Sequence, residues 1–172
     1  MDKARKTSTD TLVTSVGADS HSSLLKRLFA ELGIGEDHLE KYPLNLPGRR
    51  LWSDEARGLQ LDFKNAWLLG DDPRHAQHEG PWMLTKVVFW GARKKKIPYS
   101  HPLPYGVNFQ MSRDAARMAL LESGFGEARQ MGFSDEVDMW TRKGLEVTID
   151  YSGEKDAIRC LTVGVPINRN DT

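Results

Sequence analysis

A short internal repeat is the sequence feature that most restricts how this chain folds. Residues 31–36 read Glu-Leu-Gly-Ile-Gly-Glu, and residues 122–127, ninety-one positions later, read Glu-Ser-Gly-Phe-Gly-Glu. The residues on both sides of each copy can also be aligned. Because a duplicated unit that cannot close a core by itself must bury its apolar face against its twin, the repeat predicts two related halves packed side by side.

Each copy of the repeat lies at the end of an expected helix. In the first half, leucine and phenylalanine recur at helical spacing after Ser22 or Ser23 as the N-cap, and Gly33 is the expected stop. In the second half, Ser112 is the expected cap and Gly124 the stop. The second helix has a smaller apolar face, because that face is made largely of alanine.

Alternating apolar and polar residues follow each helix and predict half-buried strands. The apolar positions are Leu59, Leu61 and Phe63 in the first half, and Leu145, Val147, Ile149 and Tyr151 in the second. The polar positions between them are expected to face water or a partner: Gln60, Asp62, Lys64, Glu146, Thr148 and Asp150. A third apolar run, at 84–90 or 158–163, closes each half. We predict an α+β fold, with two tandem helix–β-hairpin–strand repeats forming a mostly antiparallel sheet with helices on one face.

The repeat and the proline pattern suggest the domain boundaries. Residues 1–20 are polar with little periodicity and predict a flexible tail. The first unit is expected over 21–96, with an inserted loop at 65–81 that has no counterpart in the other half. Prolines 98, 102 and 104 predict an extended linker over 97–110. The second unit is expected over 111–166, followed by a short C-terminal tail.

Composition restricts the functional classes. The 172 residues include 24 Lys and Arg and 24 Asp and Glu, a balance that argues against nucleic acid held by bulk charge. One cysteine, Cys160, forms no internal disulfide. No apolar run follows the basic N-terminal segment, so neither a signal peptide nor a membrane span is expected. We therefore expect a cytoplasmic protein that binds neither membranes nor nucleic acid.

A motif in the second half resembles a known group of proteins. The stretch from His101 to Asp114 reads His-Pro-Leu-Pro-Tyr-Gly-Val-Asn-Phe-Gln-Met-Ser-Arg-Asp, and a helix, a glycine, Trp140 and two strands are expected after it. This order resembles bacterial immunity proteins of polymorphic and type VI toxin systems. In that group a Pro-Leu-Pro-aromatic-Gly segment precedes a Met-Ser helix start, and a Trp leads an alternating strand that ends in Tyr, as Tyr151 does here. The resemblance covers about residues 98–163.

The resemblance implies a non-enzymatic, cytosolic protein that binds one cognate toxin or effector and needs no cofactor. Immunity surfaces diverge with their toxins, so the resemblance carries no binding residue onto this chain. Similar tandem units occur in secreted beta-lactamase inhibitor proteins and in outer-membrane assembly lipoproteins, but those are exported. Two alternatives stay open: a metal-dependent enzyme, and an adaptor or chaperone that delivers an effector.

The inserted loop is the first candidate site. Its aromatic, Arg and His content is typical of an interface hot spot, although a long hairpin whose tryptophans pack on the sheet would have the same composition. The predicted partner-binding residues there are Trp67, Asp71, Asp72, Arg74, His75, His78 and Trp82. The His-x-x-His spacing beside carboxylates also fits a zinc site, but no firm third ligand accompanies it, so we expect no metal.

Two charged segments are the other candidates. The acidic run containing Asp135, Glu136 and Asp138 precedes Trp140, and it is expected either to cover a basic groove of a toxin or to form a plain turn. The basic run at 93–96 fits phosphates or an acidic toxin cleft, or it solubilises the end of a strand. No catalytic residue is predicted, because Cys160 lies among apolar strand residues, where a thiol is usually inert.

Overall fold

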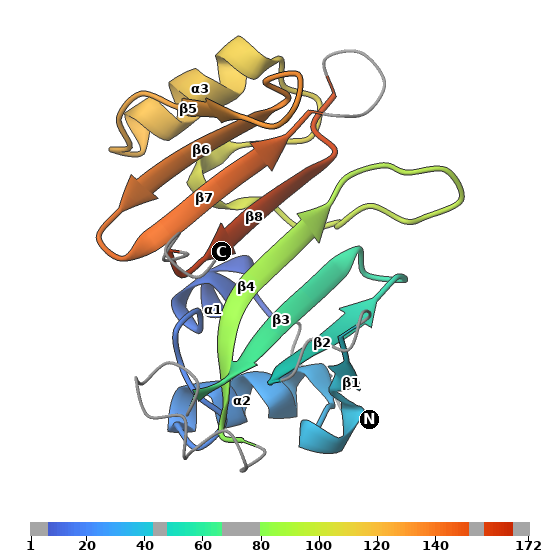
Figure 1. Ribbon diagram of the computed structural model, residues 1–172. Coiled ribbons are helices and arrows are strands. Elements are labelled where there is room, and N and C mark those ends of the chain that lie inside the picture. Colours follow the sequence, from blue (N-terminus) through green and yellow to red (C-terminus); the bar gives the residue numbers. More distant parts are fainter. Residues whose placement is uncertain (1–6, 43–47, 67–79, 152–156, 167–172) are drawn as a thin grey trace. The chain divides into compact units, whose positions relative to one another are not determined.

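The computed structural model describes residues 7–42, 48–66, 80–151 and 157–166 of the chain (Figure 1). The fold is α+β, with mostly antiparallel strands, as the sequence predicts. The chain divides into two compact units. The first unit comes from residues 1–53 and 60–87, and the second comes from residues 54–59 and 88–172.

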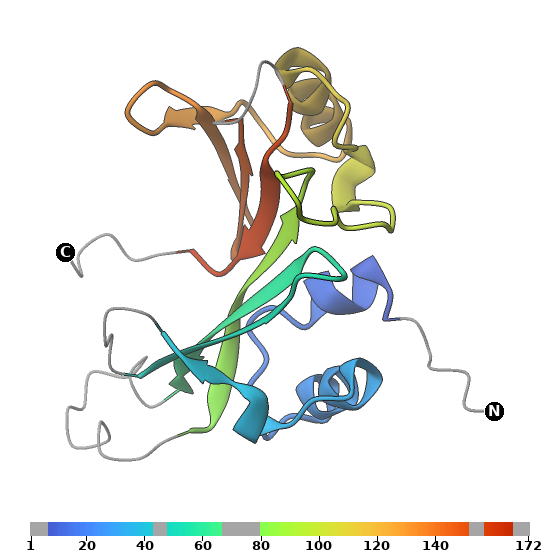
Figure 2. The ribbon, with the colours of Figure 1, turned by 90° about the vertical axis from the view of Figure 1, so that its right-hand side faces the viewer.

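Over its described residues, the first unit is a meander of four strands with two α-helices. Figure 2 shows both helices on one side of its sheet. The strands follow one another in space in the order β1-β2-β3-β4. The elements are α1 (Thr9–Thr14), α2 (Ser23–Leu32), the short 3-10 helix η1 (Glu36–His38), β1 (Glu40–Lys41), β2 (Arg49–Asp54), β3 (Leu59–Asn65) and β4 (Trp82–Trp90). Strand β4 belongs to the first unit through Val87 and to the second from Val88.

Helix α2 begins and ends as the sequence predicts. The Ser22 hydroxyl accepts a hydrogen bond from the Leu25 N–H at 3.2 Å, and Gly33 ends the helix with φ at 71°. The apolar stripe of the helix is buried in the core of the unit together with alternate residues of β3, which include Leu61 and Phe63. The Phe29 and Phe63 rings meet edge to face at 5.7 Å.

The N-terminal segment differs from the predicted flexible tail. From Ser8 onward the chain is ordered: α1 buries Leu12, and the residues after it bind the edge of β4. The Gly17 N–H donates to the Leu84 carbonyl, and the Ser20 N–H donates to the Trp82 carbonyl, each at 2.8 Å. The sequence did not reveal this pairing, because a six-residue helix has too few apolar positions to show a period.

In the described part of the second unit, one α-helix precedes four strands. Its strands lie in the order β8-β7-β6-β5, and each neighbouring pair is antiparallel. Its helix α3 lies on one side of that sheet (Figure 2). The elements are the 3-10 helix η4 (Pro104–Gly106), α3 (Arg113–Glu122), β5 (Arg129–Met131), β6 (Val137–Arg142), β7 (Leu145–Asp150) and β8 (Cys160–Gly164).

The predicted linker at 97–110 is part of the second unit's core. Tyr99, Leu103 and Val107 are buried, and the Tyr99 N–H donates to the Trp90 carbonyl at 2.9 Å. The segment is not extended throughout, because Pro104 begins the 3-10 helix η4, and its apolar residues pack inward. The boundary between the two units therefore lies within β4 and not in the proline-rich stretch.

The strand register assigns side chains to the two faces of the second sheet. Asp138 pairs with Ile149, and Trp140 pairs with Val147, so these residues share one face. Since Asp138 is hydrogen-bonded to side chains of α3, this is the face that the helix covers. The intervening residues, including Thr148, lie on the opposite face.

The two units match in several local details. Serine caps both α2 and α3, and both helices are followed by a glycine with positive φ, Gly33 or Gly124. The residue after each glycine donates back to the carbonyl five positions earlier, from Ile34 at 3.0 Å and from Phe125 at 2.9 Å. The duplication of an ancestral unit remains a prediction. Among the described residues, no helix has the length and apolar character needed to cross a bilayer.

Candidate partner-binding surface

Most of the predicted loop site lies outside the described residues. Trp67, Asp71, Asp72, Arg74, His75 and His78 belong to this group, and so does the predicted hairpin turn at 152–156. Their role in partner binding therefore stays a prediction, and the alternative of a metal site in this loop stays open. In the described parts of the chain, no three His, Cys, Asp or Glu side chains are grouped in a way that could hold a metal ion.

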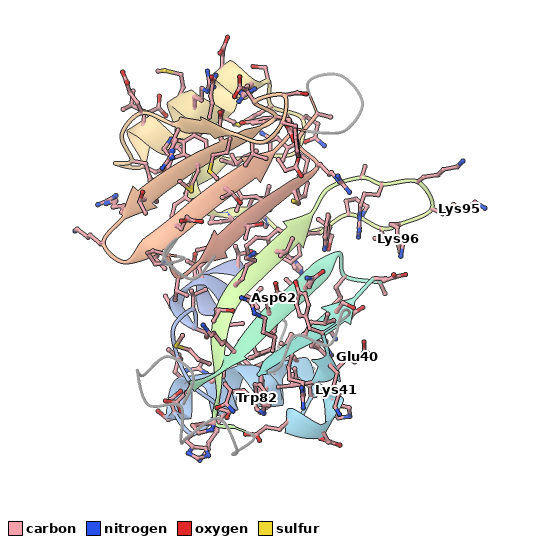
Figure 3. The ribbon with its side chains drawn as sticks, viewed as in Figure 1. Glu40, Lys41, Asp62, Trp82, Lys95 and Lys96 are labelled. Carbon is pink, nitrogen blue, oxygen red and sulfur yellow. The ribbon has the colours of Figure 1, made fainter. Side chains whose placement is uncertain are left out.

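Trp82 is predicted as a partner contact, but the structure places it in the interior. Its side chain is 5% exposed at the start of β4, and the guanidinium of Arg50 lies 4.8 Å above its ring. The Trp82 N–H donates to the Ser20 hydroxyl at 2.9 Å. Trp82 therefore fills the first unit, and Figure 3 shows it at the N-terminal end of the strand. One residue of the polar face predicted for β3 is also covered. Asp62 is buried, and its carboxylate accepts a hydrogen bond from the Gln60 side chain at 2.8 Å.

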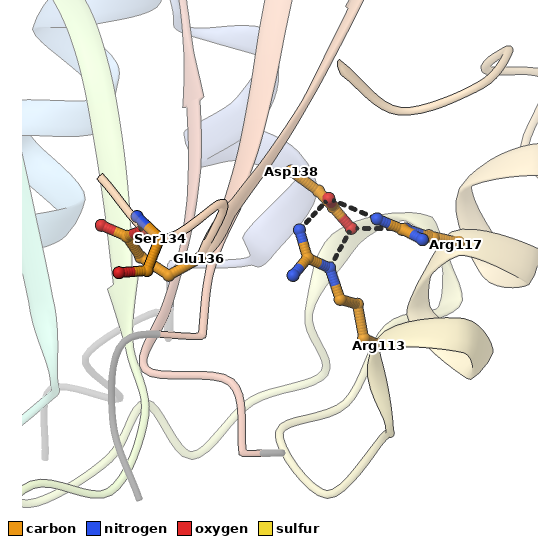
Figure 4. Close-up of polar contacts among 5 residues, drawn as sticks. All are labelled: Arg113, Arg117, Ser134, Glu136 and Asp138. Atoms are coloured by element: carbon orange, nitrogen blue, oxygen red, sulfur yellow. Dashed lines mark hydrogen bonds and ion pairs between the residues drawn. The ribbon is translucent and has the colours of Figure 1, made fainter. Parts of the chain in front are cut away.

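Asp138, also predicted as a contact, is fully buried beneath α3. Its carboxylate accepts from Nε and Nη2 of Arg113 at 3.1 and 2.6 Å, and from the same atoms of Arg117 at 2.7 and 2.9 Å (Figure 4). The two arginines are one helical turn apart and therefore reach the same point. This cluster fastens the helix to β6, so Asp138 has an internal role and not a surface role.

The charged groups in this cluster shift one another's pKa values. Burial raises the pKa of Asp138, but the hydrogen bonds from Arg117 and Arg113 outweigh it and hold that pKa below its ordinary value. The bond to Asp138 in turn raises the pKa of both arginines. Beside them, burial raises the pKa of Tyr151, whose ring lies 5.0 Å from the Arg113 guanidinium.

The turn between β5 and β6 carries the remaining two predicted contacts, Asp135 and Glu136. The turn also carries Phe133, whose side chain is fully accessible to solvent. Glu136 does not point freely into water: its carboxylate accepts the Ser134 N–H at 2.8 Å (Figure 4). Backbone hydrogen bonds from Glu136 itself, Ser134 and Phe133 hold the pKa of this carboxyl below its usual value. Asp135 has a φ of 53° and is exposed.

The backbone of this turn is specified by its own residues. Gly132 has a φ of 93°, and a Cβ at that position would collide with the Glu136 carboxylate. Asp135 adopts a left-handed conformation that Asp tolerates better than most residues. The turn therefore presents Phe133 on a backbone that the Glu136 carboxylate holds by hydrogen bonds, with the Asp135 carboxylate beside it.

A groove lies between α3 and the segment that leads into β5. It has a volume of about 580 Å³, and its lining includes Met118 and Leu121 of α3, Ala128, Gln130 and Trp140. Met118 and Leu121 are 54% and 53% exposed, which is unusual for large apolar side chains. The indole Nε1 of Trp140 is buried and has no hydrogen-bond partner among the described residues.

The basic run at 93–96 forms a tight hairpin that projects from the second unit (Figure 3). Two of its four cationic side chains have partners. The Arg93 guanidinium lies 3.9 Å above the Trp90 ring, and Lys96 forms an ion pair with Glu55. Lys94 and Lys95 are exposed. The hairpin is therefore partly a structural element, and both of its predicted roles stay predictions.

Cys160, His38 and His101 have side chains of types that many enzymes use, and each has defined neighbours in the structure. Burial raises the pKa of the Cys160 thiol to about 11, which suppresses the reactive thiolate at neutral pH. His38 accepts the Gly35 N–H at 2.8 Å, and the His101 ring stacks edge-on against Tyr99 at 5.5 Å. The latter pair lines a second cavity of about 460 Å³.

Sequence reasoning missed several residues of this surface. Phe133 has the plainest signal, because a phenylalanine between Gly132 and Ser134 lies in a turn sequence where no core position is expected. Met118 and Leu121 were missed because the predicted apolar face of this helix is its alanine side. Arg113 and Arg117 show the i, i+4 spacing, but nothing in the sequence identifies Asp138 as their common acceptor.

No protein-family model matches this chain, and neither the curated proteins nor the solved structures gave a match.

Proposed function

We propose that this protein is an inhibitor of the bacterial immunity type, which neutralises a cognate toxin domain in the cytoplasm by direct contact. The observation that carries the proposal is the full exposure of Phe133 on a turn whose backbone is fixed. A large aromatic ring displayed in water gives little to the stability of its own chain. Such side chains are typical anchors of protein interfaces, where they enter a pocket of the partner.

The fixed turn strengthens this interpretation. Ordering a loop on binding costs free energy, and a turn that is already held by its own carboxylate avoids most of that cost. Asp135 adds a negative charge next to the aromatic ring, which suits a partner whose cleft is basic. The sequence resemblance over about residues 98–163 supports the same class of function, because the turn lies within that stretch.

The test uses the product of the adjacent reading frame as the partner. Its expression is expected to arrest growth, and co-expression of this chain is expected to restore it. Phe133→Ser should weaken the complex about 30-fold or more, because loss of a central aromatic anchor typically costs about 2 kcal/mol or more. The matched control is Ile97→Ser, which removes another apolar side chain, 56% exposed, from the surface of the same unit. Growth arrest that this chain does not relieve would refute the proposal.

Two further variants separate the ring from the turn that presents it. Glu136→Ala keeps Phe133 but removes the carboxylate that holds the backbone, so it should weaken binding through loss of preorganisation. Asp135→Asn removes one charge in a residue type that still accepts positive φ, and it should mainly slow association. An adaptor or chaperone would bind the partner without blocking it, so an activity assay on the purified complex distinguishes that alternative.

A further inference from the structure

Helix α3 carries two apolar stripes, although a surface helix usually needs one. Its core stripe contains Ala116 and Leu120, which are fully buried against the sheet. Met118 and Leu121 form the second stripe, and about half of each side chain is open to water. Both line the groove that ends on the other side at the segment entering β5. The groove volume of about 580 Å³ is within the range of ordinary binding pockets.

Acidic residues stand on both walls of this groove. Asp114 lies one turn before Met118 on the helix, and Glu127 lies on the opposite wall. Both carboxylates are exposed. The cation in the lining is Arg117. Its guanidinium donates to the Asp138 carboxylate, which also accepts hydrogen bonds from Arg113. The charges that a docking segment meets first are therefore negative, around an apolar floor.

We infer that this groove receives a basic amphipathic helix of the partner protein, and this inference rests on the proposed function. The helix would lay an apolar stripe over Met118 and Leu121, in the helix-in-groove mode. Its Lys or Arg side chains, flanking that stripe, would reach Asp114 and Glu127 on the two walls. The groove thus adds a second contact to the same unit that presents Phe133.

The probe is a synthetic leucine–lysine helix of about four turns, compared with a leucine–glutamate helix of the same length and apolar content. Calorimetric titration of the full chain is expected to give one-to-one binding of the lysine peptide, at least about tenfold tighter than the glutamate peptide. The double variant Asp114→Asn with Glu127→Gln should remove that preference. Two peptides that bind alike to the unchanged chain would overturn the inference.

A second variant tests the apolar floor. Leu121→Asn should weaken the lysine peptide about tenfold, while Ile97→Asn, a control at matched exposure, should leave its affinity unchanged. Circular dichroism and thermal melting check that both variants are folded. Equal affinity in the two variants would overturn the inference. So would a dimer of this chain that Leu121→Asn dissolves, because the groove would then belong to a second copy.

Failure of the groove assignment is distinguishable from failure of the proposed function. Phe133→Ser leaves the groove intact, so it should bind the lysine peptide as the unchanged chain does. If Phe133→Ser abolishes protection against the toxin while the groove variants protect fully and the peptide does not bind, only the groove assignment fails. If the peptide binds but no variant affects protection, neither the groove nor Phe133 is the toxin contact, and the groove assignment fails although the chain still neutralises the toxin. The proposed function itself fails when the unchanged chain does not relieve growth arrest.

Discussion

The guanidinium of Arg117 donates two hydrogen bonds to the buried carboxylate of Asp138, at 2.7 and 2.9 Å. Arg113, one turn earlier on α3, makes the same pair of bonds to the same two oxygens. A single carboxylate with four charge-assisted donors is well satisfied despite its burial. It fixes the rotation of the helix on the sheet, and this rotation determines that Met118 and Leu121 face outward.

Replacing Asp138 with alanine should destabilise the second unit. The change leaves two guanidinium groups facing a neutral interior, and the expected loss is about 3 kcal/mol in the free energy of unfolding, near the low end for buried ion pairs because both arginines are partly exposed. Urea denaturation measures the loss. The control is Asp114→Asn on the same helix, whose exposed side chain should contribute less than about 0.5 kcal/mol. Similar effects in the two variants would contradict the prediction.

The same cluster should make the protein sensitive to acid. The pKa of Asp138 in the folded chain is below its ordinary value of about 3.9, so the folded state binds this proton less readily than the unfolded state. Its contribution is therefore complete above about pH 5, and it is lost as the pH falls through the folded pKa. Denaturation curves between about pH 7 and about pH 2 should show a shallower decline for Asp138→Asn than for the unchanged chain. Parallel declines would contradict this.

Two glycines with nearly the same backbone conformation should respond differently to alanine. Gly58 and Gly106 have φ of 63° and 71°, so a side chain strains both by about 1–2 kcal/mol. A Cβ at Gly58 would also lie 2.7 Å from the Pro98 carbonyl carbon and against the Tyr99 nitrogen, whereas nothing lies within 4 Å at Gly106. Gly58→Ala should therefore lower the melting temperature clearly more than Gly106→Ala. Equal shifts in melting temperature would contradict the prediction, because they would mean that the backbone at Pro98 moves away from the new side chain at little cost.

Tyr151→Phe should leave the protein equally stable or stabilise it. The Tyr151 hydroxyl is buried and has no hydrogen-bond partner among the described residues, so its removal relieves a desolvation cost. The ring, which the Arg113 guanidinium faces, is retained. We expect a gain of up to about 1 kcal/mol in chemical denaturation. A loss above that size would indicate that the hydroxyl has a partner, such as a bound water.

The regular elements could be predicted because their signals are local. Ser22 and Ser112 cap helices, Gly33 and Gly124 follow the helix ends, and strands lie where the apolar alternation predicts them. Each of these features depends on a few neighbouring residues and on backbone geometry. The predicted repeat of one helix, a β-hairpin and a strand stays a prediction, since the described part of each unit has four strands and that of the first has two α-helices.

The environment of individual side chains could not be predicted in the same way. Asp138 is in an acidic run that favours a turn, but the register of β6 turns its side chain toward α3, where two arginines happen to be available. Trp82 is of a residue type that often anchors protein interfaces, but its side chain fills the core of the first unit. The sequence predicts a linker over 97–110 because proline prevents regular pairing, but proline does not prevent neighbouring apolar residues from packing inward.

The burial of Cys160 makes this protein convenient to label. The chain has one cysteine, and the pKa of its thiol is raised to about 11. Maleimide dyes or spin labels at neutral pH should therefore not react with Cys160 in the folded state. A cysteine introduced in place of Ser134, beside the exposed aromatic ring, would then be the reactive thiol of the folded chain. Distances and on-rates to a partner become measurable without first removing the native thiol.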